Sequence, residues 1–259
     1  MGILDKFCLS GKSIIVTGGG QNIGRSMALG FAEVGADVAV VDIESDSACK
    51  VAEEVRKMGR QSVAIGADVS KKSEVEKMVQ KVAGKFGKVD VLVNNASVFG
   101  KCLPFEDITE EDWDRTISII LKGTFFCSKE VGKIMVERRS GKIINMASIV
   151  AIRAPRREYM SDFSAAKAGV VQLTKCLAAE WGKYGINVNT ISPGYHRTDS
   201  PITHMSEESR EVLLSYTPLR KTAVADDMKT VAIFLASDAS NYITGHNLVS
   251  DGGRICWYD

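Results

Sequence analysis

The chain has 259 residues, of which 45% are hydrophobic, and this is enough to bury the core of one large α/β domain. Its 33 lysine and arginine residues, set against 32 aspartate and glutamate residues, leave a formal charge of +1, which gives no overall field for nucleic acid or an anionic membrane. We therefore expect one domain over residues 1–259 that binds neither, with any anion recognised by a local site.

The N-terminal residues and the cysteines indicate the compartment. No basic segment followed by an apolar one begins the chain, and no apolar run reaches about 18 residues, so we expect a cytoplasmic protein without a membrane span. The cysteines show neither CxxC nor metal-like spacing: Cys8, Cys49, Cys102, Cys127, Cys176 and Cys256. Reduced thiols fit this distribution, and no metal site is expected.

Short β-branched runs alternate with longer stretches of helical period. Strands are predicted at residues 13–17, 37–42, 61–65, 89–94, 142–146, 187–191 and 247–250. Helices are predicted at residues 23–34, 45–58, 73–86, 110–138, 161–184 and 226–236. Runs such as VDVLV (89–93) are apolar on both faces, which is typical of covered parallel strands. The pattern predicts an α/β fold with a single-domain, doubly wound, Rossmann-type parallel sheet flanked by helices.

A glycine-rich turn, TGGGQNIG (17–24), joins the first strand to the first helix. Gly18 permits a tight turn, while Gly24 lets the helix pack close to the strand and point its first amides at a pyrophosphate. Asn22 stands where a third glycine is expected, and asparagine tolerates the left-handed region better than most residues. The turn is predicted to bind a dinucleotide cofactor through Gly18, Gln21, Asn22, Ile23 and Gly24.

Asp42 ends the second predicted strand, 18 residues after Gly24. A carboxylate at this position accepts hydrogen bonds from ribose hydroxyls and repels a 2′-phosphate. No arginine or lysine occurs at positions 19–21 or 43–44 to hold that phosphate. The sequence therefore favours NAD over NADP.

An ordered series of motifs resembles that of the short-chain dehydrogenase/reductase (SDR) family, in the branch that includes 3-ketoacyl carrier-protein reductases and sugar or polyol dehydrogenases. The motifs are TGGGQNIG (17–24), GADVS (66–70), NNAS (94–97), INMAS (144–148), FSAAK (163–167), SPGYHRT (192–198) and SDGG (250–253). The resemblance covers essentially the whole chain. It implies that Asp68 and Val69 hold the adenine edge, that Asn94 and Ala96 line the cofactor cleft, and that Lys167 holds the nicotinamide ribose.

The resemblance also implies a substrate side of the site. Ser148 would bind the substrate oxygen, and a segment at about 195–216 would form a mobile substrate lid. The loop that would cover the nicotinamide carboxamide supplies the candidates Pro193, Gly194, His196 and Thr198.

Two catalytic positions depart from the family pattern. Phe163 stands where members usually have the tyrosine that exchanges the proton, and Ile120 stands where they usually have an asparagine that anchors a relay water. Ser148 and Lys167 remain. Tyr159 does not recreate the tyrosine–lysine pair, because the residue four positions later is Phe163. Losing a general acid typically costs about 10²–10⁴-fold in rate.

Two further signals stay open. His196, with an ordinary pKa of about 6.5, is either a substitute acid, a metal ligand or a hydrogen-bonded loop residue. A cluster in the loop after Ser148 either binds an acidic sugar or is solvated, and it contains Arg153, Arg156 and Arg157.

The leading hypothesis is an NAD-dependent oxidoreductase that interconverts a secondary alcohol and a ketone, sugar-like or polyol-like, with impaired proton transfer. The alternatives are a catalytically silent NAD-binding sensor or scaffold, and a repurposed lyase or dehydratase that uses His196. The helices predicted at 110–138 and 161–184 carry more apolar positions than one face needs, and related proteins pair such helices across subunits. We therefore expect a homo-oligomer, most simply a homotetramer.

Overall fold

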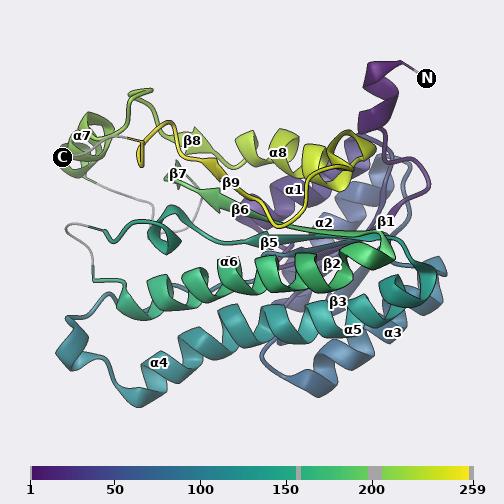
Figure 1. Ribbon diagram of the computed structural model, residues 1–259, viewed down its shortest axis with the longest axis horizontal. Coiled ribbons are helices and arrows are strands. Elements are labelled where there is room, and N and C mark those ends of the chain that lie inside the picture. Colours follow the sequence, from purple (N-terminus) through teal and green to yellow (C-terminus); the bar gives the residue numbers. More distant parts are fainter. Residues whose placement is uncertain (1, 156–158, 198–205, 257–259) are drawn as a thin grey trace.

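The computed structural model describes residues 2–155, 159–197 and 206–256 (Figure 1). Its centre is a seven-stranded parallel sheet in the order β3-β2-β1-β4-β5-β6-β9. The strands are β1 (Ser13–Thr17), β2 (Asp37–Asp42), β3 (Ser62–Gly66), β4 (Val91–Asn94), β5 (Gly141–Met146), β6 (Ile186–Pro193) and β9 (Asn247–Ser250). A small second sheet pairs β7 (His196–Arg197) with β8 (Ala223–Val224). The predicted doubly wound α/β fold is confirmed.

Helices cover both faces of the large sheet (Figure 1). They are α1 (Asn22–Glu33), α2 (Ser45–Lys57), α3 (Lys72–Phe86), α4 (Glu110–Ile117), α5 (Gly123–Arg138), α6 (Ser161–Trp181), α7 (Glu207–Ser215) and α8 (Asp227–Ala236). One face packs against α1, α2 and α8, and the other packs against α3, α5 and α6. Among the helices of the described ranges, none has both the length and the apolar character needed to cross a membrane.

Strand β1 shows why both faces need a cover. Ile14 and Val16 pack into the cluster on the α1, α2 and α8 side, while Ile15 packs into the cluster on the α3 and α5 side. All three side chains are fully buried. Because successive side chains of a strand point to opposite faces, a strand that is apolar at every position must lie between two helical layers.

The helix predicted over residues 110–138 is present, but its pattern is not α-helical throughout. Helices α4 and α5 are separated by a π-helical turn at Ser118–Lys122. At the start of α5, the side-chain hydroxyl of Thr124 donates to the carbonyl oxygen of Ile120, which lies in this turn, at 2.7 Å. Such a side-chain bond competes with the backbone ladder, and single π turns are frequent at functional sites.

Other predicted boundaries also shift. The helix predicted to reach residue 184 ends at Trp181 and is followed by a 3₁₀ turn, Gly182–Tyr184. The segment 195–216 was predicted only as a lid, but it contains β7 and α7. Helix α7 begins after Ser206, whose hydroxyl accepts a hydrogen bond from the Ser209 amide at 3.2 Å. Residues 198–205 lie outside the described residues.

Asp90 fastens β1 to β4 at their amino ends. One of its carboxylate oxygens accepts the Ser13 amide and the Lys88 ammonium, both at 2.9 Å, and the other accepts the Arg138 guanidinium at 3.1 Å. Burial opposes ionisation of Asp90, but these donors outweigh it and lower the pKa of the carboxyl below its usual value.

We expect Asp90→Asn to lower the free energy of unfolding at pH 7 by about 1.5–3 kcal/mol, because the charge that three donors share is lost. A carboxyl with a lower pKa in the folded state stabilises the fold above its unfolded pKa, and that stabilisation disappears as the pH falls through the folded pKa. The difference between variant and parent, measured by urea unfolding, should therefore shrink from pH 7 to pH 3.5. The exposed Asp114→Asn serves as a control, and an equal loss at both pH values would contradict the prediction.

Candidate active site

The carboxyl ends of β1 and β4 meet at the point where the strand order reverses. The chain leaves β1 toward β2 and leaves β4 toward β5, and in open α/β sheets such a reversal marks a crevice outside the carboxyl ends of the strands. Gly18, just after β1, has a φ of +61°, and a Cβ there would lie 2.9 Å from the Cα of Ala96, just after β4. Only glycine fits this approach. Ligands of open α/β sheets bind at such switch points.

Asn95 holds the two loops together, although the sequence analysis did not single it out. Its side-chain amide donates to the carbonyl oxygens of Thr17 at 3.0 Å and Gly18 at 2.9 Å. The hydroxyl of Thr17 accepts the backbone amides of Asn95 and Ala96 at 3.0 and 3.2 Å. The doubled asparagine of NNAS was the available signal.

The glycine-rich turn has the backbone that the sequence predicts. Asn22 adopts a left-handed conformation with a φ of +51°, as expected for the position where a third glycine would stand. A Cβ on Gly24 would collide with the carbonyl oxygen of Gly18, so α1 begins directly against the turn. Gln21 is exposed and Ile23 is half-buried on either side of Asn22.

Asp42 lies against this turn. Its side chain is 5% exposed, and its carboxylate accepts the Gly20 amide at 2.9 Å and the Glu44 amide at 3.1 Å. Each carboxylate oxygen has a second lone-pair site, so these bonds leave acceptor capacity for further donors. A Cβ on Gly20 would lie 2.9 Å from the same carboxylate, which shows how closely the turn and the acid pack.

Asp68, Val69, Asn94 and Ala96 occupy the same edge of the sheet. Burial opposes ionisation of Asp68, but hydrogen bonds from the hydroxyl and amide of Ser70 outweigh it and lower the pKa of its carboxyl. Val69, Asn94 and Ala96 line a small hollow. The Asn94 amide donates to Ser128 at 2.9 Å and to Asn145 at 2.8 Å, while its carbonyl oxygen has no partner within the described ranges.

Ser148 and Lys167 meet near the carboxyl end of β5. Ser148 is half-buried, and its hydroxyl accepts the Val150 amide at 3.3 Å at the start of a 3₁₀ turn. Lys167 comes from α6, is 3% exposed, and donates from Nζ to the carbonyl oxygen of Met146 at 2.7 Å. Burial lowers the pKa of Lys167 to about 7. Within the described residues, no carboxylate lies within 4.0 Å of this nitrogen to offset the burial.

The two departures from the SDR pattern lie in one apolar cluster. Phe163 is 5% exposed and Ile120 is 1% exposed, and both belong to a cluster completed by Ala147, Ala166 and Val170. The π turn places Ile120 there. Lys167 Nζ lies 5.4 Å from the centroid of the Phe163 ring. The position that the family resemblance predicts to be catalytic is therefore occupied by hydrocarbon.

Phe99 and Asp162 border this cluster and were missed by the sequence analysis. The Phe99 ring stacks on Phe163 with centroids 4.9 Å apart and an 18° angle between the planes. Asp162 is 4% exposed and accepts the Thr116 hydroxyl at 2.7 Å, which links α6 to α4. No local sequence signal marked either residue, because each depends on a neighbour that is distant along the chain.

His196 is buried rather than exposed at the mouth of the site. Its side chain is 6% exposed, its Nδ1 lies 3.1 Å from the carbonyl oxygen of Gly194, and its Nε2 has no partner within the part of the chain that the structure describes. Burial lowers the pKa of His196 below its ordinary value, so the ring is neutral at pH 7 and carries no proton to give as an imidazolium. This argues against His196 as the substitute acid.

The neighbouring candidates are only partly described. Pro193 ends β6, and the Gly194 amide donates to the carbonyl oxygen of Ser250 at 2.9 Å. Thr198, Arg156 and Arg157 lie outside the described residues, and Arg153 is exposed. Across the described ranges, no group of three or more histidine, cysteine, aspartate or glutamate side chains is arranged to hold a metal ion.

Comparisons with known proteins agree with this geometry. A family profile described as "Enoyl-(Acyl carrier protein) reductase" matches residues 18–254. A structure of a short-chain type dehydrogenase/reductase from Mycobacterium marinum superposes with a TM-score of 0.94 at 32% identity, over 99% of this chain and 100% of that one. The chain belongs to the SDR family. It is therefore a member of an oxidoreductase family.

Two curated SDR relatives act on different substrates. The chain is 41% identical over 243 residues to 3-oxoacyl-(acyl-carrier-protein) reductase FabG of Staphylococcus epidermidis, covering 93% of this chain and 98% of the relative. It is 35% identical over 255 residues to 2-dehydro-3-deoxy-D-gluconate 5-dehydrogenase of Dickeya dadantii, covering 98% and 99%. A structure of NAD⁺-bound xylitol dehydrogenase has a TM-score of 0.89 at 30% identity, over 95% of this chain and 99% of that one.

We expect Gly24→Ala to abolish cofactor binding, because the added methyl group collides with the Gly18 carbonyl and forces α1 away from the turn. Gly84→Ala in α3 is the matched control, since nothing lies within 4 Å of a Cβ there and alanine has a higher helix propensity than glycine. Titration of cofactor fluorescence would measure both variants, with circular dichroism to check the fold. Parent-like affinity in Gly24→Ala would contradict the close packing.

We expect Lys167→Met to raise the free energy of unfolding at pH 6 by on the order of a few kcal/mol, since a buried ammonium is replaced by an apolar chain of similar length. Between pH 7 and about 10 the unfolded chain keeps the proton that folded Lys167 has released, so the parent gains stability as the pH rises. The advantage of the variant should therefore shrink toward pH 10 in denaturant unfolding. Lys175→Met, exposed on the same helix, is the control. Destabilisation at pH 6 would refute the assignment.

Proposed function

We propose that this SDR protein is an NAD(H)-dependent oxidoreductase that interconverts a secondary alcohol and a ketone, with proton transfer weakened by Phe163 and Ile120. The supporting observation is that Ser148 and Lys167 stand beside the carboxyl end of β5, next to the switch-point crevice. A sugar-like or polyol-like substrate is supported by the gluconate and xylitol dehydrogenases among its relatives, although FabG acts on an acyl-carrier-protein substrate.

The residues of the crevice fit a dinucleotide. The glycine-rich turn has no room for a Cβ at Gly18 or Gly24, so its backbone stays bare on this side. The Asp42 carboxylate beside the turn keeps acceptor capacity for further hydrogen bonds. The proposed contacts are Gly18, Gln21, Asn22, Ile23, Gly24, Asp42, Asp68, Val69, Asn94, Ala96, Lys167, Pro193, Gly194, His196 and Thr198. When bound, a nicotinamide supplies or accepts the hydride.

The protein's own part in the reaction is to orient the substrate oxygen and handle the proton. The Ser148 hydroxyl already accepts the Val150 amide, so its proton is available to donate to the substrate oxygen. Phe163 offers no hydroxyl, and the hydrocarbon side chain of Ile120 offers no amide to anchor a relay water. Lys167, with a pKa of about 7 and its Nζ 5.4 Å from the centroid of the Phe163 ring, is left as a titratable group beside that position.

A second function is favoured by the Phe99–Phe163 stack. Two aromatic rings in contact fill the catalytic position with apolar surface, and this suits a catalytically silent NAD-binding sensor or scaffold. In the lyase or dehydratase alternative, the lowered pKa of His196 leaves this residue only the general-base part of its proposed acid/base role. We also propose a single domain over residues 1–259, a substrate lid near residues 195–216 and a cytoplasmic location. A homotetramer is proposed as well, and the exposed apolar ring of Phe125 on α5 supports it.

We expect NAD to bind at least 10-fold more tightly than NADP, because the Asp42 carboxylate accepts from ribose hydroxyls and repels a 2′-phosphate. Asp42→Ala should weaken NAD binding by about 10–100-fold, while the exposed Asp46→Ala should leave it unchanged. Fluorescence titration of both cofactors would measure this. Equal affinities in the parent would rule out the NAD assignment.

We expect Phe163→Tyr to raise dehydrogenase activity by on the order of 10²-fold or more, because it places a phenol beside Lys167 with the addition of one oxygen. The gain in the oxidation direction should grow with pH as the phenol ionises. Adding Ile120→Asn should help further, and the two effects need not add because they act in one relay. NADH formation on a panel of ketoses, polyols and other alcohols is the measurement.

Phe125→Tyr, exposed on α5, is the control for adding a phenol elsewhere and should not change activity. If cofactor binds but neither Phe163→Tyr nor the double variant changes activity across the panel, the missing phenol is not what limits dehydrogenase activity. The sensor or scaffold function would then replace the oxidoreductase.

A further inference from the structure

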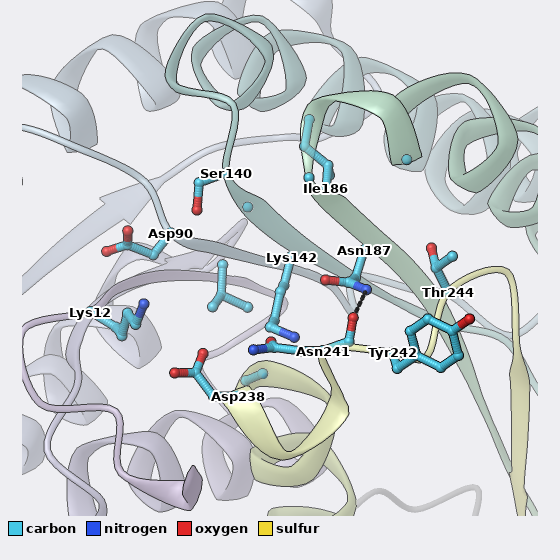
Figure 2. Close-up of a pocket in the computed structure, with 15 residues that line it drawn as sticks. Lys12, Asp90, Ser140, Lys142, Ile186, Asn187, Asp238, Asn241, Tyr242 and Thr244 are labelled. Carbon is cyan, nitrogen blue, oxygen red and sulfur yellow. Dashed lines mark hydrogen bonds between the residues drawn. The ribbon is translucent and has the colours of Figure 1, made fainter.

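A second cavity lies at the opposite edge of the sheet from the cofactor crevice. It has a volume of about 620 Å³ and is bordered by the first residues of three strands: Val91 of β4, Gly141 of β5 and Ile186 of β6. The segment after α8 closes another side with Asp238, Asn241 and Tyr242. Figure 2 shows Lys12, Lys142 and Asp238 reaching from separate elements toward this hollow. Nothing in the proposed oxidoreductase site uses it.

Lys142 is the unusual side chain of this cavity. It is 8% exposed, and its Nζ donates to the Ser240 hydroxyl at 3.1 Å. An ammonium has three protons to donate, and this bond uses one. Within the described residues, no carboxylate lies within 4.0 Å of Nζ. Burying an ammonium is costly unless an opposite charge accompanies it, and the protein itself supplies no close counter-charge to Lys142.

The other charged groups around the cavity do not supply that counter-charge. Lys12 is half-buried, lines the cavity and adds a second positive charge close enough to influence Lys142. Asp90 lines the wall, but its carboxylate already holds Ser13, Lys88 and Arg138. Asp238 also acts on Lys142, but it is exposed and more than 4.0 Å from the ammonium.

Burial lowers the pKa of Lys142 to about 8, with Asp238 raising it and Lys12 lowering it further. The ammonium is therefore mostly protonated at pH 7 and below. Of the four charged residues that line the cavity, Asp90 is already paired with Lys88 and Arg138, which leaves Lys12 and Lys142 facing the single carboxylate of Asp238. The unpaired charges around a cavity with room for a small molecule are therefore positive on balance.

We propose that this cavity binds a phosphate group, carried by a small molecule or free, between the ammonium groups of Lys12 and Lys142. A phosphate brings a charge of about −1.5 to −2 and three strong acceptor oxygens, which suit two ammonium groups. Lysine binds phosphate as a point charge, and one phosphate group carries more charge to share between two ammonium groups than the single negative charge of a carboxylate. The remaining wall, with Ser140, Asn187 and Asn241, offers polar groups to the rest of such a molecule.

Isothermal titration calorimetry of the full-length chain at pH 7 with inorganic phosphate and with ribose 5-phosphate tests this proposal, with ribose as the uncharged comparison. We expect saturable binding of at least one phosphate probe and none of ribose. Lys142→Met and Lys12→Met should each weaken it at least 10-fold. Asp238→Asn should tighten it several-fold, because a repelling carboxylate is removed. Binding should also weaken as the pH rises above 8 and Lys142 loses its proton.

Two controls separate this cavity from other phosphate sites. Lys85→Met, at the exposed end of α3, should leave the affinity unchanged, and so should Gly24→Ala, which disrupts the glycine-rich turn. Tighter binding of ribose 5-phosphate than of inorganic phosphate assigns the cavity to a phosphorylated small molecule, and equal binding assigns it to free phosphate.

Absence of saturable binding up to 20 mM of either probe would overturn the proposal, as would binding that both lysine variants leave intact. If Lys142→Met does not fold, as judged by circular dichroism, Lys12→Met and Asp238→Asn decide the outcome. Their opposite expected effects on affinity cannot arise from a general loss of structure.

Discussion

The side-chain amide of Asn95 donates hydrogen bonds to the carbonyl oxygens of Thr17 and Gly18, and the arrangement of the candidate site depends on this contact. It fixes the loop after β4 to the loop after β1 at the point where the sheet reverses its strand order. The approach is so close that Gly18 and Gly24 have no room for a Cβ. With the turn fixed in this way, α1 begins at the crevice, and the Gly20 amide reaches the carboxylate of Asp42 at the end of β2. A flexible turn would not hold the Gly20 amide in place to fix the Asp42 carboxylate.

The π turn between α4 and α5 has a comparable role for the catalytic centre. It brings Ile120 into the cluster that contains Phe163, while the preceding helix supplies Thr116 to the buried carboxylate of Asp162. The two residues that depart from the family pattern are therefore neighbours in space. Phe99, which stacks on Phe163, extends the same apolar surface. Both positions carry apolar side chains that pack in this cluster instead of the polar side chains usual in the family, and this packing is the basis of the proposed weakening of proton transfer.

A buried lysine side chain lies at each end of strand β5. Lys167 bonds the carbonyl of Met146, the last residue of the strand, and Lys142 is the second residue of the same strand. Within the described ranges neither ammonium has a carboxylate within 4.0 Å, and burial lowers the pKa of both. Perturbed groups of this kind gather where ligands bind, because a ligand can offset the cost of burial that the protein itself leaves uncompensated. At the carboxyl end that ligand is the proposed cofactor, and at the amino end it is the proposed phosphate.

The sequence by itself determined the elements that depend on neighbours close along the chain. Strands with apolar side chains on both faces required helices on both sides, and Gly18, Asn22 and Asp42 occupied the places that the first strand–helix–strand unit dictates. Tertiary structure alone decided the rest. The burial that makes His196 neutral depends on the packing around β7. The stack of Phe99 on Phe163 and the placement of Lys12 and Lys142 around one cavity bring together residues from separate elements. Periodicity reports which face a residue takes, but only the folded chain determines which distant residue it faces.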